Sequence, residues 1–206
     1  MARYRGPKNR IARRFGANIF GRSRNPLLHK PHPPGQHGTK RKKKSDYGVQ
    51  LEEKQKLRAC FGMISQHQLA KYYKTAVSNK QNTQDLFMQQ LESRLDIIVY
   101  RLKLALTIFH AQQLVSHGNI LVDGKKIDIR SFQVKPGMII SLKEKAKNNN
   151  FIKQSLERAS MNVPEYLSLN APKMSGEMLS SPHLDQIPLP IPVNVAVVCE
   201  YLAHSI

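Results

Sequence analysis

Histidine and cysteine are the side chains best suited to chemistry in this chain, and their spacing gives them no common site. His29, His32 and His37 lie among prolines and glycines, with no nearby cysteine or carboxylate to complete the coordination shell of a metal ion. Cys60 and Cys199 form no CxxC pair, so the sequence predicts neither a zinc site nor a disulfide framework. We therefore predict no metal ion and no cofactor.

The acidic residues and the glycines do not indicate catalysis either. Glu52 and Glu53 are adjacent, so on a helix they point in different directions and suit solvent better than acid and base work. The stretch GANIFGRSRNP at 16–26 holds two glycines but follows no strand, which argues against a nucleotide-binding fingerprint. We predict that the chain is not an enzyme.

The first feature that indicates a function is the run of five cations from Lys40 to Lys44. It ends a segment, residues 1–45, that holds 14 Lys or Arg and no Asp or Glu, and the whole chain of 206 residues carries a net charge of +19. A charge of this size repels itself in a compact state, and a polyanionic partner relieves the repulsion. A solvated loop is the alternative interpretation. The acid-free context favours nucleic acid, with salt-dependent binding because bound phosphates release counterions.

A second set of polar residues begins at residue 94. We expect Arg94, Arg101 and Lys103 on the polar side of an otherwise apolar helix, where they could meet a sugar-phosphate backbone. The alternative is an ordinary small α+β domain with a polar surface, in which Arg94 and Asp96 serve as a cap and an ion pair.

The same stretch continues to residue 128 with further candidates. Gln113 and His117 are four residues apart, so they project from one face of a helix. Lys125 and Lys126 directly follow an expected hairpin turn. Together these side chains could line one face along an RNA backbone.

Hydrophobic spacing and caps predict the elements that hold these residues. We expect a helix at 46–62, and Ser65 then begins a capping box, S-x-x-Q, for a helix that continues to residue 76. A further single helix is predicted at 83–102. Thr107 resembles an N-cap, with its helix ending at 117–118.

After that helix the pattern changes to strands. Asp123 and Gly124 predict a type I′ hairpin turn between two short strands, and a third strand is expected at 138–142. Residues 94–145 thus form one compact unit of two helices and a small sheet. A linker or helix end follows.

The remainder is less regular. We expect 151–162 to be helical and 170–192, with its five prolines, to be extended. Val193, Val195, Val197, Cys199 and Tyr201 alternate along the chain and predict a final half-buried strand.

Several stretches together resemble a known family. MARYRGP at the start, PGQHG at 34–38, KSDYGVQL at 44–51, RLDIIVYRL at 94–102 and QLVSHGNILVDGK at 113–125 occur in the order and at the spacing of the bacterial and organellar family of small-ribosomal-subunit protein four. The resemblance covers nearly the whole chain. The part from 94–128 alone also resembles an RNA-binding module of some pseudouridine synthases, tyrosyl-tRNA synthetases and heat-shock RNA-binding proteins.

The resemblance implies an α+β fold. A mainly helical N-terminal domain is completed by the C-terminal tail, and a small α/β RNA-binding module of two helices and a small β-sheet is inserted between them. We expect a basic extended segment at 1–45, the helical part of the ribosomal domain at 46–93, the inserted RNA-binding module at 94–156, and the returning tail at 157–206.

The implied function is structural. Members of the family bind the 5′ domain of small-subunit ribosomal RNA, nucleate assembly of the subunit and contribute to translational accuracy. The implied partners are that RNA, proteins five and three of the small subunit, and messenger RNA at its entry channel, where the family has cations at the positions of Lys40–Lys44. We expect the protein on ribosomes in the cytoplasm, in a bacterium rather than an organelle. No apolar run approaches the 18 residues of a membrane span, so we predict no membrane partner.

The candidate RNA-binding residues are cations, together with aromatic and polar side chains near them. Tyr72 and Tyr73 could also stack on bases, or could pack in the helical core. The candidates are Arg3, Tyr4, Arg5, Lys8, Arg10, Arg13, Arg14, Lys40, Arg41, Lys42, Lys43, Lys44, Tyr47, Lys54, Lys56, Arg58, Arg94, Arg101, Thr107, Gln113, His117, Lys125 and Lys126.

The sequence departs from the family pattern at four places. Arg5 stands where many members have the first cysteine of a zinc set, which agrees with the prediction of no metal. Lys103 replaces a usual glycine, and 108–112 lacks arginines that many members have. Residues 181–192 match poorly.

Two other functions are weighed against this one. An RNA-modifying enzyme could use the same module, but it would need a catalytic domain for which the remaining chain has no room. A free-standing nucleic-acid-binding repressor would share the charge, but it would not account for a resemblance over the full length.

Overall fold

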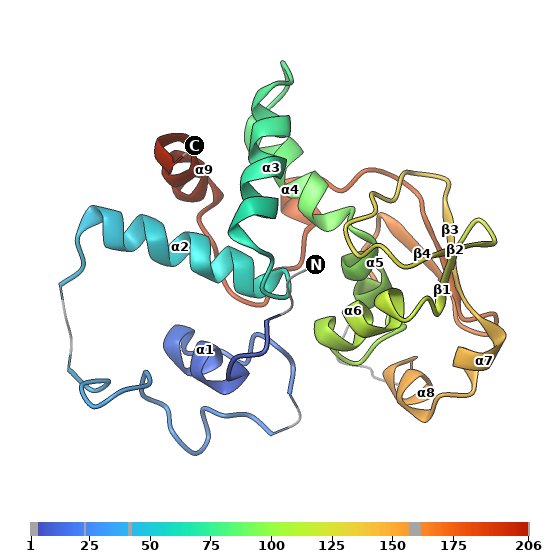
Figure 1. Cartoon of the computed structure of the whole chain (residues 1–206), viewed down its shortest axis with the longest axis horizontal. Helices are drawn as coiled ribbons and strands as arrows, with labels where there is room; N and C mark the ends of the chain where they lie inside the picture. The colour runs from blue at the N-terminus through green and yellow to red at the C-terminus, as the bar shows by residue number, and fades with distance from the viewer. Residues whose placement is uncertain (1–3, 23, 41–42, 157–161, 206) are drawn as a thin grey trace. The chain divides into compact units, whose positions relative to one another are not determined.

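The structure is a computed structural model that describes residues 4–22, 24–40, 43–156 and 162–205 (Figure 1). The chain folds into two compact units. Unit 1 is built from the chain up to Gln84 together with the segment from Leu189 onward, and unit 2 is Asp85–Pro188. Arg3, Arg41 and Lys42, three of the candidate residues, lie outside the described residues.

Unit 1 consists of helices joined by irregular segments, and two of these helices begin at serine caps. The Ser45 hydroxyl accepts the Gly48 N–H at 3.3 Å, and the Ser65 hydroxyl accepts the Gln68 N–H at 3.2 Å, which confirms the predicted cap at Ser65. The helices lying wholly in this unit are α1 (Lys8–Phe15), α2 (Asp46–Cys60), α3 (Gln66–Val77) and α9 (Val195–Ser205).

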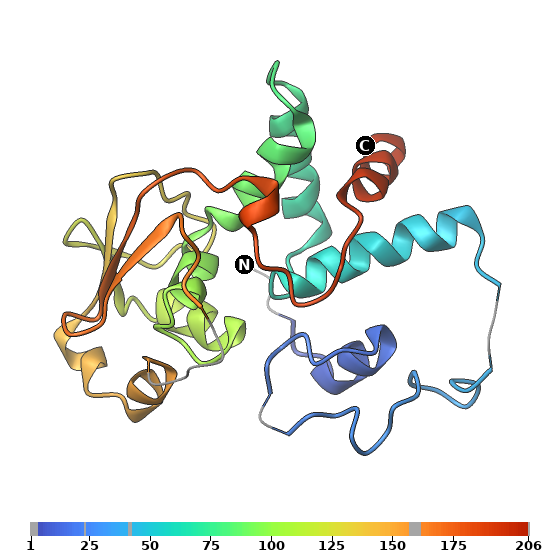
Figure 2. The same ribbon diagram turned by 180° about the vertical axis from the view of Figure 1, so that it is seen from behind.

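The predicted C-terminal strand is wrong, because Val195–Ser205 is the helix α9. Asn194 caps it: its side-chain oxygen accepts the Val197 N–H at 3.3 Å. The buried residues include Val195, Val198 and Leu202, which follow the spacing of a helix and not the alternation of a strand. They turn inward where α9 lies against α2, side by side in both views (Figures 1 and 2).

Unit 2 combines helices with a single sheet. The single helix predicted at 83–102 is two helices, because the backbone of Arg94 is extended and forms an antiparallel bridge with Gln133. The Val134 N–H donates to Ser93 O at 2.8 Å there. The helices of this part are α4 (Thr83–Glu92), α5 (Leu95–Arg101), α6 (Ile108–Ser116), α7 (Glu144–Lys147), α8 (Asn150–Leu156) and the 3-10 helix η1 (Leu184–Gln186).

The sheet has five antiparallel strands in the order β2-β1-β3-β5-β4. Asp123 and Gly124 have φ of 47° and 77°, which confirms the predicted hairpin turn, since both positions of a type I′ turn need positive φ. The strands are β1 (Ile120–Val122), β2 (Lys125–Ile127), β3 (Ile139–Leu142), β4 (Leu167–Asn170) and β5 (Ser175–Met178).

The strands β4 and β5 were not expected, and they lengthen unit 2. β5 pairs with β3 and carries β4 on its other side, so the chain leaves this unit at Pro188 and not at residue 156. Part of the segment expected to be extended, 170–192, is therefore sheet. The predicted helix at 151–162 is described to Leu156, and 157–161 lie outside the described residues.

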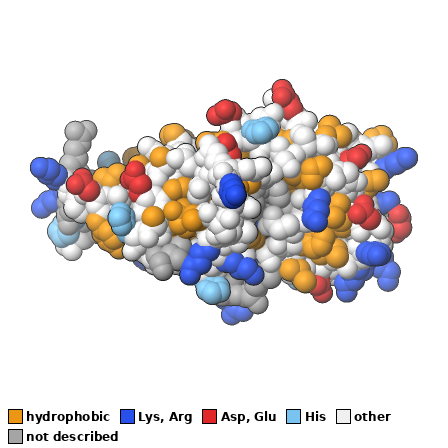
Figure 3. Space-filling view, turned by 90° about the horizontal axis from the view of Figure 1, so that it is seen from above, with side chains coloured by type: hydrophobic (Ala, Val, Ile, Leu, Met, Phe, Trp, Pro, Cys, Tyr) orange, Lys and Arg blue, Asp and Glu red, His pale blue; other side chains and the backbone are white. Residues whose placement is uncertain are grey.

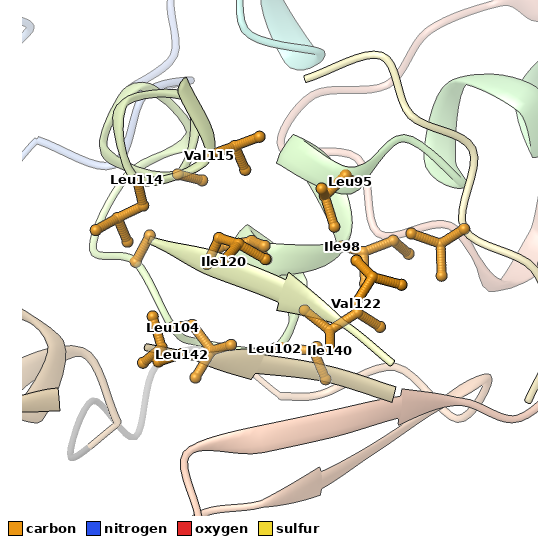
Figure 4. Packing of buried hydrophobic residues seen from close by; sticks show 14 of the residues in the cluster. Leu95, Ile98, Leu102, Leu104, Leu114, Val115, Ile120, Val122, Ile140 and Leu142 are labelled. Atoms are coloured by element: carbon orange, nitrogen blue, oxygen red, sulfur yellow. The ribbon is translucent and has the colours of Figure 1, made fainter. Parts of the chain in front are cut away.

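The core of unit 2 lies between α5, α6 and the sheet (Figure 4). Ile98 from α5, Val115 from α6, and Ile120 and Ile140 from the strands are fully buried. Burial of such side chains contributes about 1.5–3 kcal/mol each, so this layer fixes where α6 and the β1–β2 hairpin lie. The outward side chains of α6 and of this hairpin form one part of the candidate interface.

Candidate nucleic-acid interface

Helix α1 presents some of its arginines outward and uses one internally. Arg10 and Arg14 are exposed and four residues apart, so they share one face. Arg13 is different: its Nε donates to the backbone oxygens of Lys30 and His32, both at 3.0 Å. Arg13 therefore holds the irregular segment around residues 30–32 against α1.

The other candidates of the N-terminal segment differ in exposure. Arg5 is exposed, Lys8 is half-buried, and the half-buried Tyr4 ring lies so close to Gly6 that its Oη would be 2.4 Å from a Cβ there. Tyr4 thus packs locally against the backbone. Lys40 is exposed.

Acidic side chains of α2 engage several of the predicted cations. Lys44 forms an ion pair with Glu52, and Lys56 pairs with Glu53 at 2.5 Å. Lys43 is exposed. Of the described cations in the run 40–44, Lys40 and Lys43 are therefore better placed than Lys44 for a polyanion.

Lys54 was predicted to contact RNA, but it is buried, with an exposed fraction of 4%. Its Nζ lies 4.0 Å from the centroid of the Tyr201 ring on α9, a cation–π contact. The reason is that α9 is a helix that covers this side of α2. We remove Lys54 from the proposed contacts.

Tyr47 of α2 and Tyr201 of α9 form a hydrogen-bonded pair beside Lys54. Their hydroxyl oxygens are 3.4 Å apart and their ring centroids 5.7 Å. The hydrogen bond with Tyr47 and a second one with Lys54 lower the pKa of Tyr201 to about 8. The hydrogen bond with Tyr201 raises the pKa of Tyr47. Tyr47 itself is 61% exposed.

Arg58 and Tyr72 have mainly structural contacts. Arg58 Nε donates to Ile64 O at 2.7 Å and its Nη1 donates to Gln55 Oε1 at 3.0 Å, and burial lowers its pKa. Tyr72 is buried in the core of unit 1, as the packing alternative predicts, whereas Tyr73 is half-buried.

In unit 2 the expectation that Arg94 and Arg101 lie on a polar surface is wrong, because both are buried. Arg94 donates to both carboxylate oxygens of Asp96, at 3.0 and 2.9 Å, which is the ion-pair alternative. Gln112 from α6 also donates to Asp96, at 3.4 Å. These contacts tie α6 to the start of α5.

Arg101 belongs to a second buried network. Its Nε donates to Glu92 Oε1 at 2.5 Å, and the hydroxyl of Tyr166 donates to the same oxygen at 2.8 Å. Burial alone would lower the pKa of Arg101, but the carboxylate of Glu92 raises it above the ordinary value. Glu92 had not been expected as a partner, since nine residues separate the two in a stretch predicted to be one helix.

Helix α6 presents the polar face that the sequence predicts. The Thr107 hydroxyl accepts the His110 N–H at 3.2 Å, so Thr107 serves as the N-cap. Gln113 and His117 are exposed. His110 stands three residues before Gln113 and so belongs to the same stripe, although sequence reasoning had not selected it.

The hairpin joins this face at the end of α6. A Cβ on Gly118 would lie 2.2 Å from Cε of Lys126, so the aliphatic part of Lys126 crosses directly over this glycine. Lys125 and Lys126 are both exposed. The structure thus places Lys126 against the end of α6. We use the name α6–hairpin face for Gln113 and His117 of α6 together with Lys125 and Lys126 of the hairpin.

Two further observations concern other kinds of site. Among the described residues, no group of three or more His, Cys, Asp or Glu side chains could hold a metal ion. Arg24 Nε donates to His29 Nε2 at 3.3 Å, while His32 and His37 are exposed. In the described part of the chain, no helix combines the length and the apolar composition of a membrane span.

Comparison with known proteins gives the class of this fold. The chain matches the model of the ribosomal protein S4/S9 N-terminal domain over residues 3–92 and that of the S4 domain over residues 93–140. The two matches follow each other along the chain, and the second begins at Ser93, directly before the ion pair of Arg94 and Asp96. They define a ribosomal protein with an S4 RNA-binding domain.

Full-length relatives define the family more closely. The chain is 63% identical over 207 residues to small ribosomal subunit protein uS4 of Chlamydia trachomatis serovar L2, with 99% of each chain covered. It is 60% identical over 205 residues to the uS4 of Protochlamydia amoebophila, with 100% of each covered, and 59% identical over 207 residues to that of Chlamydia pneumoniae, with 99% of each covered. The chain belongs to the family of small ribosomal subunit protein uS4. The family resemblance is thereby confirmed, and the family is one of structural proteins and not of enzymes.

Proposed function

We propose that this chain is a structural component of the small ribosomal subunit and binds small-subunit ribosomal RNA with the exposed cations of its N-terminal segment and with the α6–hairpin face. The observation that carries the proposal is identity of 60–63% to uS4 proteins over essentially the full chain. The acid-free residues 1–45 add an independent electrostatic reason.

Contacts of the N-terminal segment are to phosphates. Arg5, Arg10 and Arg14 are exposed, and a guanidinium offers a planar fork that matches two phosphate oxygens. The deep groove of A-form RNA is closed to side chains, so recognition rests on shape, backbone and unpaired bases. Lys40 and Lys43 supply further charge at the end of the segment.

The α6–hairpin face contributes hydrogen bonds as well as charge. Gln113 and His117 offer donors and acceptors to the sugar 2′-hydroxyl and phosphate, while Lys125 and Lys126 add cations beside them. The buried pair of Arg94 and Asp96 sets the position of this face through Gln112.

The finer part of the proposal comes from the family resemblance. The protein binds the 5′ domain of the RNA early, nucleates assembly of the subunit and contributes to translational accuracy. Its protein partners are proteins five and three of the subunit, and the cations around Lys40–Lys44 line the messenger-RNA entry channel. These roles place it on ribosomes in the bacterial cytoplasm.

Hydroxyl-radical footprinting on naked small-subunit ribosomal RNA, at two salt concentrations, tests the RNA-binding role. Protection confined to the 5′ domain at both concentrations is the expected result. Diffuse protection that disappears at the higher concentration would contradict it, since it would indicate only nonspecific attraction, as in a free-standing repressor without its target.

The channel role has a separate test. Small subunits that contain this chain are programmed with a messenger RNA carrying photoreactive uridines downstream of the decoding site. We expect cross-links to the segment that contains Lys40 and Lys43. Cross-links to other proteins of the subunit but none to this segment would contradict the channel role and leave the RNA-binding role intact.

A further inference from the structure

Helix α8 places a large aromatic side chain in solvent. Phe151 is 59% exposed. The Asn149 side-chain oxygen accepts the Phe151 N–H at 3.0 Å and so fixes the first turn of α8, while Ile152 and Ser155 are buried on its inner side. The outward direction of Phe151 therefore follows from the way the helix is anchored.

The neighbour of Phe151 is a second aromatic ring, from α6. The rings of Phe151 and His110 meet edge to face, with centroids 6.3 Å apart and an angle of 77° between their planes. Burial lowers the pKa of His110 and so favours the uncharged imidazole, which suits an edge-to-face contact between two rings.

The two rings continue the α6–hairpin face. His110, Gln113 and His117 are separated by three and four residues and so form one stripe along α6. The stripe begins at the contact with Phe151 and ends beside Lys126, which crosses Gly118. An RNA strand on this face would meet cations at one end and exposed aromatic surface at the other.

We propose that Phe151, supported by His110, is a stacking site for an unpaired nucleobase of the bound RNA. The inference rests on the proposed function and adds the class of ligand that this end of the face takes. Every base has a π face, so an exposed ring beside a polar, cationic stripe suits unpaired RNA. A protein partner would instead favour an apolar surface, whereas the stripe that continues along α6 from His110, the neighbour of Phe151, carries the polar residues Gln113 and His117.

The first experiment compares the affinities of full-length variants for small-subunit ribosomal RNA. Loss of one stacked base weakens binding by about tenfold, so Phe151→Ala is expected to do so while Phe151→Tyr binds like the parent. Stacking releases no phosphate counterions, and the salt dependence should therefore stay unchanged. Leu179→Ala is the matched control, because Leu179 is 55% exposed on another part of unit 2.

The second experiment uses the absence of tryptophan from the chain. Phe151→Trp introduces a single indole at the proposed site, and Leu179→Trp introduces one at the control position. Addition of the RNA should quench the emission of the first variant, because the indole stacks on a base, and leave that of the second nearly unchanged.

Each contrary result has its own meaning. If the parent binds the RNA and Phe151→Ala binds equally well, or if both indoles respond alike, the stacking site is wrong and the proposed function stands. If emission at position 151 responds only in assembled subunits, and not with naked RNA, a protein occupies the site and the inference is overturned. If the parent fails to bind the RNA, the proposed function falls and the inference with it.

Discussion

Arg101 and Arg14 have the same side chain and opposite surroundings. Arg101 is buried against Glu92 and Tyr166, where its charge is neutralised inside the protein. Arg14 is exposed on α1. Removing one partner from a buried pair leaves an unpaired charge in the core, whereas removing an exposed arginine costs little stability. At the residue scale, burial therefore divides the cations into those that stabilise the fold and those left to bind a ligand.

The tyrosine pair gives a prediction about pH. Hydrogen bonding lowers the pKa of Tyr201 to about 8, so tyrosinate absorbance should show a first step near pH 8, below the ordinary tyrosine value. Because the folded-state pKa is lowered, ionised Tyr201 adds stability as the pH rises from about 8 towards the unfolded value, and this contribution is lost as the pH falls through 8. Tyr47, whose pKa is raised, offsets part of it.

Spectrophotometric titration of Tyr47→Phe checks the cause. Loss of the hydrogen bond should move the first step upwards, towards the ordinary value. A first step that stays near pH 8 in this variant would show that Tyr47 is not responsible.

Lys103 gives a second prediction, because it has φ of 58°, a conformation that favours glycine. It follows the end of α5, where its N–H donates to Tyr100 O and the Leu104 N–H donates to Val99 O, the bonds of a Schellman motif. Lys103→Gly should raise the free energy of unfolding by about 1 kcal/mol in urea denaturation. Lys103→Ala loses the same side chain but keeps Cβ, so an equal gain in both variants would contradict backbone strain as the reason.

At the element scale, α9 shows how a partner selects secondary structure. Val193, Val195 and Val197 alternate as in a strand, yet Val195, Val198 and Leu202 fit a helix face equally well. The cap at Asn194 and the apolar side of α2 favour the helix. Glu53 of α2 reinforces this choice, because its Oε2 accepts the Asn194 N–H at 2.9 Å.

The sheet of unit 2 depends on a glycine, Gly176 of β5, because neighbouring atoms occupy the space that a side chain would need. A Cβ on Gly176 of β5 would lie 2.4 Å from Cδ2 of Leu102 and 2.7 Å from the backbone oxygen of Ser168. We expect Gly176→Ala to lower the free energy of unfolding by about 1–3 kcal/mol, through overpacking. Thermal denaturation measures the effect, with Ser175→Ala on the opposite face of β5 as the control. An equally small change in the two variants would contradict overpacking at Gly176.

At the scale of the whole molecule, charge is distributed unevenly along the chain. On the face shown in Figure 3, Lys and Arg side chains stand in small groups with acidic side chains among them. Residues 1–45 have no acid, whereas residues 150–206 hold five acids and three cations. The electrostatic contribution to RNA binding should therefore come mainly from the N-terminal segment.

This distribution predicts the salt dependence of binding. The triple variant Arg5→Gln, Arg10→Gln and Arg14→Gln should weaken binding to small-subunit ribosomal RNA and reduce the slope of log affinity against log salt by about 2–3. Filter binding over a range of salt concentrations measures both.

A charge-matched control removes three other exposed cations, Lys80, Lys135 and Lys173. Its slope should change much less, because these lysines are outside the proposed contacts. Equal slopes for the two triple variants would mean that net charge, and not the N-terminal segment, governs binding.

Features that depend on local chemistry are evident from the amino-acid sequence. Ser65 and Thr107 cap helices because their hydroxyls reach N–H groups three residues on, and Asp123-Gly124 turns the hairpin because both tolerate positive φ. The basic segment and the shared face of Gln113 and His117 were likewise evident, since each needs only composition or helical spacing. Family motifs supplied the architecture.

Features that depend on residues far apart in the chain become visible only in the folded protein. Whether Lys54 meets solvent depends on Tyr201, 147 positions away, and whether the chain near residue 170 forms strands depends on β3. The contact of Phe151 with His110 also joins two helices that no local pattern connects. A charge or a hydrophobic pattern is a property of the chain, but its burial and its partners are set by packing, and packing is not local.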